Sequence, residues 1–466
     1  MKKNVIALLI ALFSCAIVNA QPERYELGKR TRALEIELEK PTTPEVRKNA
    51  MAEITKSVQK FFAFNLREAA RDLDNARFIL EQNTSDNKIW AESLAVSPDF
   101  RLLDEINPTI NLTISNFYKV PQTIPKGAVV RFSLTPSAGA SVKRLAEFSI
   151  KELPMTNKIA LAKVKAGDYF LLSEIVVGNE VLANSKQLFS ISAKLNERLK
   201  TLETKLGETK MSDWQTETSR ENLKILQNLA NGKTLETDYH ANNLLNQTEV
   251  FAKVSTKFAA KNNQLTLIFP LKGGNQTSRI LIPTNYDGKR ETPLLIALHG
   301  AGGSENLFFD SYGNGKTVRL CEKRGWFLVA PRNFGFSAEK LDEFIENLTK
   351  LYKIDRTKIF LIGHSLGSIQ SLMLAVTKPK TFAGVALIST GGAPKVSEEM
   401  KNLPFFLGTG TQDFSFNGTQ SLHTLLTESG VKQVEYKVYD DIEHLTALQF
   451  SLNDVFRFFD EISTKR

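Results

Sequence analysis

The chain has 466 residues, of which 42% are hydrophobic and 24% are charged, and both values are ordinary for globular protein. This length allows two to four domains. The formal net charge of +9 arises from 60 Lys and Arg residues against 51 Asp and Glu residues, and no basic run with interleaved aromatic residues accompanies it. The composition therefore argues against nucleic acid as a partner and indicates a mildly basic, solvated surface.

The first 20 residues resemble a secretory signal peptide in composition. Two lysines precede an apolar stretch at 5–18, which is too short to span a bilayer comfortably. A cleavage site of the small-x-small type ends at Ala20. We therefore expect an exported protein, periplasmic or secreted, with no later transmembrane segment. A lipoprotein anchored through Cys15 is an alternative that Phe13 disfavours, and an uncleaved anchor is another.

Cysteine content is low. The chain has only Cys15 and Cys321, so removal of the leader would leave one cysteine and no internal disulfide. Cys321 lies in a predicted helix, and we interpret it as a small buried residue. The stability of the mature chain would then depend on its hydrophobic cores.

Residues 21–95 are predicted to form an N-terminal helical segment. Thr43 followed by Pro44 is a typical helix start, because proline is favoured at the first helical position. Apolar residues then recur at helical spacing over 54–62, and a second helix is expected over 65–80. We expect this segment to pack against the next domain, and a partner-binding helix pair is the alternative.

Residues 96–195 change to short strands. Apolar and polar residues alternate with period two at 109–114 and at 129–134, and Gly178-Asn179 between two strand-like runs indicates a hairpin. Several short strands with regular turns predict a small β-sandwich-like module. Modules of this kind bind a carbohydrate or protein ligand or serve as spacers, and the sequence leaves these uses open.

Residues 196–260 are charged, with sparse apolar spacing, and we interpret them as a helical connector. From 261 to 466 strand-like and helix-like segments alternate, which predicts a mostly parallel sheet with helices on both faces. Ligands of such sheets bind beyond the carboxyl ends of the strands. Besides the strand that leads into 363, we expect strands at 265–269, 279–282, 294–298, 326–330, 384–388, 405–407 and 434–439.

The sequence Gly363-His364-Ser365-Leu366-Gly367 follows an apolar strand and precedes a helix-like segment. It has the form of a nucleophile elbow, in which a sharp turn holds the central serine in a strained conformation with its hydroxyl exposed. A Cβ atom at either glycine would crowd the close approach of strand and helix. The alternative is an ordinary glycine-rich loop, which the pattern alone does not exclude.

A serine hydroxyl needs a base to become nucleophilic, and the base needs an acid to orient it. After an elbow of this kind the chain order is Ser, then Asp or Glu, then His. Of the histidines that follow Ser365, His423 lies inside a predicted helix, whereas His444 follows the last predicted strand. We therefore predict His444 as the base, and a loop histidine without a role is the alternative.

Asp413 is the predicted acid, because it comes just past the preceding strand in a loop that glycines allow to turn tightly. An aspartate that only closes a local turn is the structural alternative. Asp440, Asp441 and Glu443 are the rival acids. They share a loop with His444 and are therefore less able to meet its ring squarely.

An oxyanion hole needs backbone N–H groups directed at the developing charge. The N–H of Leu366, directly after the elbow serine, is one predicted donor. The loop 299–303 (His-Gly-Ala-Gly-Gly) follows a buried strand, and its small residues allow close backbone approach, so Ala301 and Gly302 are the other candidates. His299 is expected to pack or to form hydrogen bonds beneath this loop.

Six phenylalanines fall on predicted loops at the carboxyl ends of the strands, where they would form an apolar or aromatic acyl pocket. Core packing is the alternative for each of them. We predict Phe414 and Phe334 as substrate-binding residues. The full set is Phe308, Phe309, Phe334, Phe336, Phe414 and Phe416.

With these features in one order, residues 261–466 resemble the α/β-hydrolase superfamily. The sequence at 355–358 (Asp-Arg-Thr-Lys), which leads into the elbow, is similar to the esterase, polyhydroxybutyrate-depolymerase and feruloyl-esterase members. The resemblance implies Ser365 as nucleophile, Asp413 as acid and His444 as base. At about 206 residues this region leaves little room for an inserted cap.

The leading hypothesis is an exported serine esterase that hydrolyses a small-molecule or polymeric carboxylic ester through an acyl-enzyme. A serine peptidase of the same fold is an alternative, and so is a binding protein whose β module carries a weak hydrolase. The sequence has no His-Glu-x-x-His or Cys-x-x-Cys, so we expect neither a metal site nor a cofactor.

Overall fold

A computed structural model describes residues 21–465 except 83, 107, 140, 162–163, 256–262 and 334. The expected leader, residues 1–20, lies outside the described residues. The chain divides into two compact units, and each is considered by itself. The first unit holds the described residues up to Arg30 and from Lys60 to 255, and the second holds Thr31–Gln59 and the residues from 263 on.

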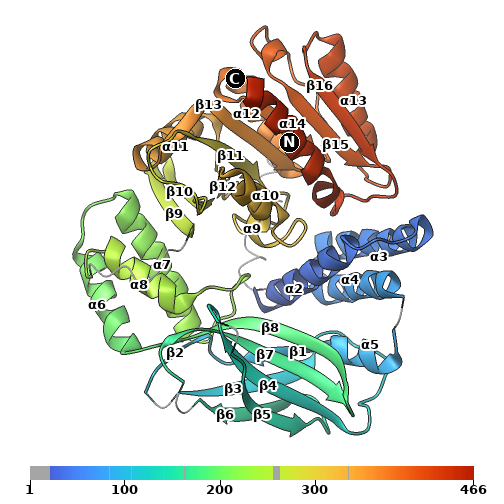
Figure 1. Cartoon of the computed structure of the whole chain (residues 1–466), viewed down its shortest axis with the longest axis vertical. Helices are drawn as coiled ribbons and strands as arrows, with labels where there is room; N and C mark the ends of the chain where they lie inside the picture. Colours follow the sequence, from blue (N-terminus) through green and yellow to red (C-terminus); the bar gives the residue numbers. More distant parts are fainter. Residues whose placement is uncertain are drawn as a thin grey trace, which may run out of the picture. The chain divides into compact units, whose positions relative to one another are not determined.

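The strands of the first unit form two sheets (Figure 1). A three-stranded sheet has the order β1-β3-β6 and a five-stranded sheet the order β2-β8-β7-β4-β5, in which only the β2–β8 pair is parallel. One cluster of buried apolar side chains draws on both sheets, including Ile110 and Leu112 from β3 and Phe132 from β4. The strands are β1 (Leu94–Pro98), β2 (Leu102–Asp104), β3 (Thr109–Asn116), β4 (Ala128–Pro136), β5 (Lys143–Ser149), β6 (Met155–Ala160), β7 (Gly167–Val177) and β8 (Glu180–Ser192).

The period-two pattern read from the sequence explains this packing. Along β4, buried side chains alternate with partly exposed ones, as expected for a strand with one face on a core. The strand-rich region predicted before the C-terminal domain is therefore confirmed. Helices precede and follow it: α2 (Gln21–Leu38), α4 (Leu66–Glu81) and α5 (Asp86–Glu92) before it, and α6 (Leu195–Glu208), α7 (Trp214–Ala230) and α8 (Ala241–Phe251) after it.

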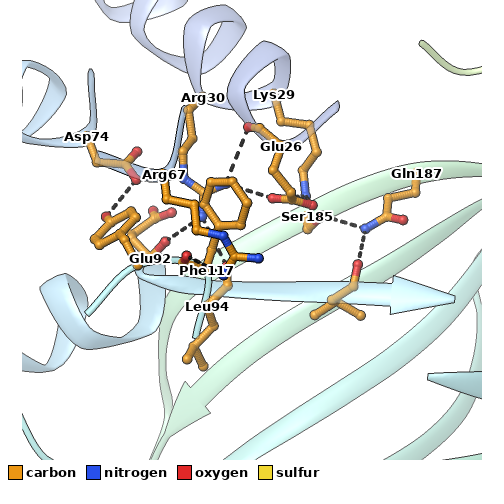
Figure 2. Close-up of polar contacts among 12 residues, drawn as sticks. Glu26, Lys29, Arg30, Arg67, Asp74, Glu92, Leu94, Phe117, Ser185 and Gln187 are labelled. Carbon is orange, nitrogen blue, oxygen red and sulfur yellow. Dashed lines mark hydrogen bonds and ion pairs between the residues drawn. The ribbon is translucent and has the colours of Figure 1, made fainter. Parts of the chain in front are cut away.

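Arg30 joins the first part of α2 to α4 and β1 through buried polar contacts (Figure 2). Its guanidinium donates to Asp74 Oδ2 at 2.8 Å, to Glu26 Oε2 at 2.6 Å, and to the carbonyl oxygens of Glu92 and Leu94 at 3.0 and 3.1 Å. A buried charge is tolerated only when it is paired and its remaining donors are satisfied. This arginine meets both conditions.

The second unit is built on an eight-stranded mixed sheet of order β16-β15-β14-β13-β11-β12-β10-β9. Neighbouring strands from β12 through β16 are parallel, and β9 and β10 are antiparallel additions at one edge. The strands are β9 (Gln264–Leu271), β10 (Gly274–Leu281), β11 (Thr292–Leu298), β12 (Phe327–Pro331), β13 (Ile354–His364), β14 (Gly384–Ile388), β15 (Phe405–Gly410) and β16 (Val434–Tyr439).

The last six residues of β13 are all buried. Because successive side chains of a strand point to opposite faces of the sheet, both faces must be covered, and helices cover them. The predicted mostly parallel sheet is confirmed. The helices are α9 (Leu307–Asp310), α10 (Lys316–Arg324), α11 (Ala338–Leu351), α12 (Leu366–Thr377), α13 (Phe416–Glu428) and α14 (Ala447–Lys465), with short 3₁₀ turns η1 (Pro379–Thr381) and η2 (Met400–Asn402).

Part of the N-terminal helical segment belongs to this second unit. The last residues of α2 and most of α3 (Pro44–Phe62) pack here, and Ala50, Met51 and Ile54 of α3 are fully buried. The Gln449 amide of α14 donates to the backbone oxygen of Glu35 in α2 at 2.7 Å. Residues far before the parallel sheet are thus a structural part of the unit that contains it.

Candidate active site

Ser365 occupies the turn between β13 and α12. Its backbone has φ 55° and ψ −121°, a conformation that costs a non-glycine residue about 1–3 kcal/mol. Its N–H donates to Ile388 O at 2.9 Å, which ties the turn to the end of β14. The strained strand–turn–helix geometry expected of an elbow is present.

Two glycines make this turn sterically feasible. A Cβ atom on Gly363 would lie 2.5 Å from Gly367 O, and one on Gly367 would lie 2.0 Å from Leu298 O at the end of β11. Both distances are far below any real carbon–oxygen contact. The start of α12 therefore approaches β11 and β13 as closely as it does only because neither residue has a side chain.

His444, in the loop after β16, lies between Ser365 and Asp413. Its Nε2 is 2.8 Å from Ser365 Oγ, and its Nδ1 is 2.8 Å from Asp413 Oδ1. The three residues follow β13, β15 and β16, so the carboxyl ends of three parallel strands bring them together. The arrangement is a serine, a base within hydrogen-bonding reach, and an acid that orients the base. The catalytic roles themselves remain predictions.

The Asp413 carboxylate is buried and is held by several donors. Besides His444, the N–H and the hydroxyl of Ser415 both donate to Oδ1 at 2.8 Å, and the Thr409 hydroxyl donates to Oδ2 at 3.3 Å. Burial alone would raise the pKa of the Asp413 carboxyl. Its interactions with His444 and the Ser389 hydroxyl and the hydrogen bond from the Ser415 N–H outweigh burial and lower the pKa to about 2. The group is therefore an anion at neutral pH.

The rival acids on the His444 loop have other surroundings. Glu443 accepts hydrogen bonds from the N–H groups of Leu445 and Thr446 at 2.9 and 2.8 Å. Asp441 accepts from the Gln412 amide at 3.2 Å, and Asp440 is exposed. The structure thus places Asp413, and not these three, against the imidazole.

The predicted oxyanion loop runs beside Ser365. A Cβ atom built on Gly300 would lie 3.5 Å from Ser365 Cβ, and Gly302 has φ +75°. Leu366 is the first residue of α12, and the N–H of a first helical residue has no acceptor within its own helix. The loop is therefore next to the serine, while the donor roles of Ala301, Gly302 and Leu366 stay predictions.

His299 stabilises this loop from below. Its Nδ1 donates to Gly300 O at 2.9 Å, and its Nε2 accepts from the Asn333 N–H at 3.3 Å. The Asn333 amide in turn donates to His299 O at 2.6 Å. This agrees with the supporting position expected for His299.

Two residues that sequence reasoning passed over, Tyr312 and His364, lie against the site. The Tyr312 hydroxyl is 2.9 Å from His364 Nδ1, and His364 Nε2 is 2.9 Å from His444 O. The chain-order argument set His364 aside because it precedes the serine. A tyrosine in a loop with two nearby glycines, 313 and 315, was the only signal for Tyr312.

The phenylalanines expected to form a pocket differ in their exposure, and Phe416, the first residue of α13, is half-buried. Phe308, Phe309 and Phe336 are buried and contribute to the core. Phe414 is 72% exposed and its ring stacks on His444, with ring centroids 4.0 Å apart. Phe334, the other predicted substrate-binding residue, lies outside the described residues.

The described part of the chain offers no cluster of three or more His, Cys, Asp or Glu side chains suited to holding a metal ion. Cys321 is a free, buried thiol. None of the helices described here combines the length and the apolar composition that crossing a bilayer requires.

Comparison with known proteins gives one family and several solved structures. Residues 293–436 match the family model described as alpha/beta hydrolase fold. A thermostable esterase is 16% identical, with coverage of 79% of this chain and 99% of that one and a TM-score of 0.40. The feruloyl esterase module from Clostridium thermocellum is 14% identical (42% and 87% coverage, TM-score 0.36). An S-formylglutathione hydrolase from Staphylococcus aureus is 14% identical (43% and 98%, TM-score 0.36).

The family match covers nearly all of β11, the elbow, α12, Asp413 and the first half of β16, and it ends before His444. It therefore spans most of the parallel part of the sheet. The matched sequence, the sheet order and the elbow geometry together show that this region of the chain has the α/β-hydrolase fold.

Proposed function

We propose that the protein is a serine hydrolase that cleaves carboxylic esters through an acyl-enzyme on Ser365. The observation that carries this proposal is the continuous contact from Ser365 Oγ through His444 to Asp413, with both distances at 2.8 Å. The family of residues 293–436 and the esterase names of the similar structures support it.

In the proposed reaction, Ser365 Oγ attacks the ester carbonyl while His444 Nε2 takes the hydroxyl proton. Asp413, ionised and hydrogen-bonded to Nδ1, stabilises the imidazolium that forms. N–H groups of Leu366 and of the loop 299–303 would hold the oxyanion. His444 returns its proton to the departing alkoxide oxygen, and a water molecule activated by the same imidazole then hydrolyses the acyl-enzyme.

Exposed apolar side chains next to Ser365 favour an ester with an apolar group. Leu366, Ile369 and Met373 are 50%, 46% and 65% exposed, and their spacing places them on one face of α12. Phe414 on His444 extends this apolar surface. Within the described part of this unit, Ile36 is the one other large apolar side chain that is exposed to this degree.

The test is hydrolysis of p-nitrophenyl acetate and butyrate by the mature chain and by a Ser365→Ala variant. Activity that disappears in the variant supports the nucleophile, and a parallel assay on peptide substrates separates esterase from peptidase. A folded wild-type chain without ester hydrolysis, or a variant as active as wild type, would refute the proposal.

The apolar surface has its own test in Phe414→Ala, assayed on short and on aromatic acyl esters. Burial of a phenylalanine ring is worth about 1.5–3 kcal/mol, so we expect a loss of roughly tenfold or more in kcat/KM for the aromatic ester and a smaller one for acetate. Equal losses on both would refute a role in substrate binding.

We further propose export of the protein, on the charged and apolar leader at 1–20. N-terminal sequencing of the protein recovered from the periplasm or medium should begin at Gln21. Recovery from the cytoplasm with the leader intact would contradict this.

A further inference from the structure

The Tyr312 hydroxyl lies where three loops of the candidate site meet. It accepts a hydrogen bond from the Gly300 N–H at 3.2 Å, and it is 2.9 Å from His364 Nδ1. His364 Nε2 in turn is 2.9 Å from the backbone oxygen of His444. Tyr312 and His364 together therefore connect the loop after β11, the elbow at the end of β13 and the loop after β16.

Simple donor and acceptor rules fix the protons in this chain of contacts. A carbonyl oxygen only accepts, so His364 Nε2 must carry a proton and donate to His444 O. Burial, with His444 nearby, lowers the pKa of His364 to about 3, so the ring is neutral and its Nδ1 accepts from the Tyr312 hydroxyl. Burial also raises the pKa of Tyr312, which keeps its proton. Each group thus has one consistent direction of donation.

The contacts act on the two geometries that the proposed reaction needs. Gly300 begins the predicted oxyanion loop, so the bond from its N–H to Tyr312 holds the backbone that precedes Ala301 and Gly302. The bond from His364 to His444 O holds the backbone of the predicted base. A displacement of about 1 Å in such groups can cost on the order of a hundredfold in rate.

The loop that carries Tyr312 is strained. Four successive residues have positive φ: Tyr312 (53°), Gly313 (85°), Asn314 (52°) and Gly315 (73°). Left-handed backbone costs a non-glycine residue about 1–2 kcal/mol, and such conformations persist only where the surroundings determine them fully. This loop therefore needs an external partner to keep the Tyr312 hydroxyl in place.

Glu35 of α2 is that partner. Its Oε1 accepts from the Tyr312 N–H at 2.8 Å and its Oε2 from the Asn314 N–H at 2.9 Å. Successive N–H groups of such turns form a concavity that suits an anion. The Glu35 side chain is buried. Burial raises the pKa of its carboxyl and the hydrogen bonds from these N–H groups lower it; burial has the larger effect, so the pKa is about 7. Glu35 lies outside the family match at 293–436 but inside the same compact unit.

We propose that Glu35 and Tyr312 are positioning residues for the proposed catalytic site, in which Glu35 holds the loop 311–315 so that Tyr312 fixes both the oxyanion loop and, through His364, the backbone of His444. This inference rests on the proposed function for its kinetic consequences. Its structural content, the restraint of the loop 299–303 by Tyr312 and Glu35, is independent of any substrate.

The kinetic test compares Tyr312→Phe and Glu35→Gln with wild type on p-nitrophenyl butyrate. Both variants keep the shape of the side chain, and we expect kcat to fall by about tenfold to a hundredfold with KM within about twofold. Tyr286→Phe is the matched control for tyrosine, because its hydroxyl also accepts a backbone N–H, from Lys353 at the opposite end of β13. Glu346→Gln is the control for charge, since Glu346 pairs on the surface with Arg356 near the start of β13.

A double variant tests whether the two residues act as a chain. If Glu35 works through Tyr312, adding Glu35→Gln to Tyr312→Phe should lower kcat by less than about threefold further. Losses that multiply, a Tyr312→Phe enzyme with wild-type kcat, or losses confined to KM would each overturn the proposal.

Hydrogen exchange gives a readout that needs no substrate. The peptide containing residues 299–303 should exchange faster in Tyr312→Phe and in Glu35→Gln than in wild type, at matched Tm, and should be unchanged in Glu346→Gln. Unchanged exchange in the first two variants would overturn the proposal even if the chain hydrolysed no ester. Faster exchange in a chain without esterase activity would support the restraint and refute only the proposed function.

Discussion

Replacing Asp413 by Asn separates two contributions of the acid to His444: the hydrogen bond that fixes the tautomer of the ring, and the negative charge beside it. The amide has the shape of the carboxylate, but it lacks the charge and has one oxygen. If its NH₂ turned toward His444 Nδ1, the ring would carry its proton on Nε2 and could not accept one from Ser365. Such a change of tautomer costs about 10⁴ in kcat in serine proteases.

The contacts around Asp413 predict the milder outcome. His444 Nδ1, the Ser415 N–H and the Ser415 hydroxyl all meet Oδ1, each at 2.8 Å, whereas Oδ2 accepts from the Thr409 hydroxyl at the longer distance of 3.3 Å. An asparagine oxygen at the first position satisfies all three donors, and the NH₂ can donate to the Thr409 oxygen. The amide is therefore expected to keep the productive tautomer and to lose only the charge.

The size of that loss follows from the Asp413 pKa, which the site lowers from 3.8 to about 2. One pKa unit corresponds to about 1.4 kcal/mol, so the net stabilisation of the anion is about 2 kcal/mol. A charge that stabilised the resting ring and the imidazolium equally would leave kcat unchanged. If the imidazolium gains about 2 kcal/mol more from the Asp413 charge than the resting ring does, Asp413→Asn should lower kcat by roughly 50-fold.

The assay is initial-rate hydrolysis of p-nitrophenyl butyrate, with Asp441→Asn as a control that removes a charge from the neighbouring loop. Wild-type activity in Asp413→Asn, or an equal loss in Asp441→Asn, would refute the assignment of Asp413. A loss near 10⁴ would refute the argument from the contacts and indicate that the amide turns.

Three further predictions concern stability. The folded-state pKa of Asp413 lies below its ordinary value of 3.8, so the ionised carboxylate stabilises the fold above pH 4 and this stabilisation is lost as the pH falls toward 2. Urea unfolding should show a free energy of unfolding about 2 kcal/mol lower at pH 2.5 than at pH 5, and this difference should be absent in Asp413→Asn. The same difference in wild type and variant would contradict the prediction. Gly367→Ala, whose Cβ would lie 2.0 Å from Leu298 O, should lower Tm by roughly 10 °C or more, whereas Gly207→Ala, with open space around it, should not. Asp74→Asn leaves the buried Arg30 guanidinium with Glu26 as its remaining carboxylate partner and should cost on the order of 3 kcal/mol in urea unfolding. A loss no larger than that of Glu147→Gln, which removes a charge from an exposed pair, would contradict the importance of the network.

The parts of the molecule that the sequence predicted are those with short-range signals. The run 358–367 contains its own strand, turn and helix start, and the buried residues 359–363 that precede His364 at the end of β13 are all nonpolar. The chain-order rule then reduced the search for partners of Ser365 to a few residues. The contact between His444 and Asp413 could be predicted because each residue follows a recognisable strand.

Sequence reasoning failed where the direction of a side chain decides the outcome. Phe308, Phe309 and Phe336 were expected at a pocket, and they are in the core instead. An aromatic residue on a loop at the carboxyl end of a sheet can point inward or outward, and composition does not distinguish the two. Phe414 is exposed because the Asp413 turn carries it over His444.

The Glu35–Tyr312 contact was beyond reach for a different reason. The two residues are 277 positions apart, and α2 lies before the β module in the chain. No periodicity or motif in the sequence predicts a contact between residues at that separation. Only the fold shows that the N-terminal helical segment contributes to the hydrolase unit.

Backbone strain in the second unit is concentrated at the candidate site. Its described non-glycine residues with positive φ are Tyr312, Asn314, Ser365, Ser389 and Asp441. All five follow the carboxyl end of β11, β13, β14 or β16, the edge where Ser365 meets His444. At about 1–3 kcal/mol each, this strain exceeds what the turns could hold by themselves. The site therefore requires the buried contacts around these turns, from Ile388, Tyr312 and Glu35. A chain that began at residue 293, where the family match starts, would lack the contact from Glu35.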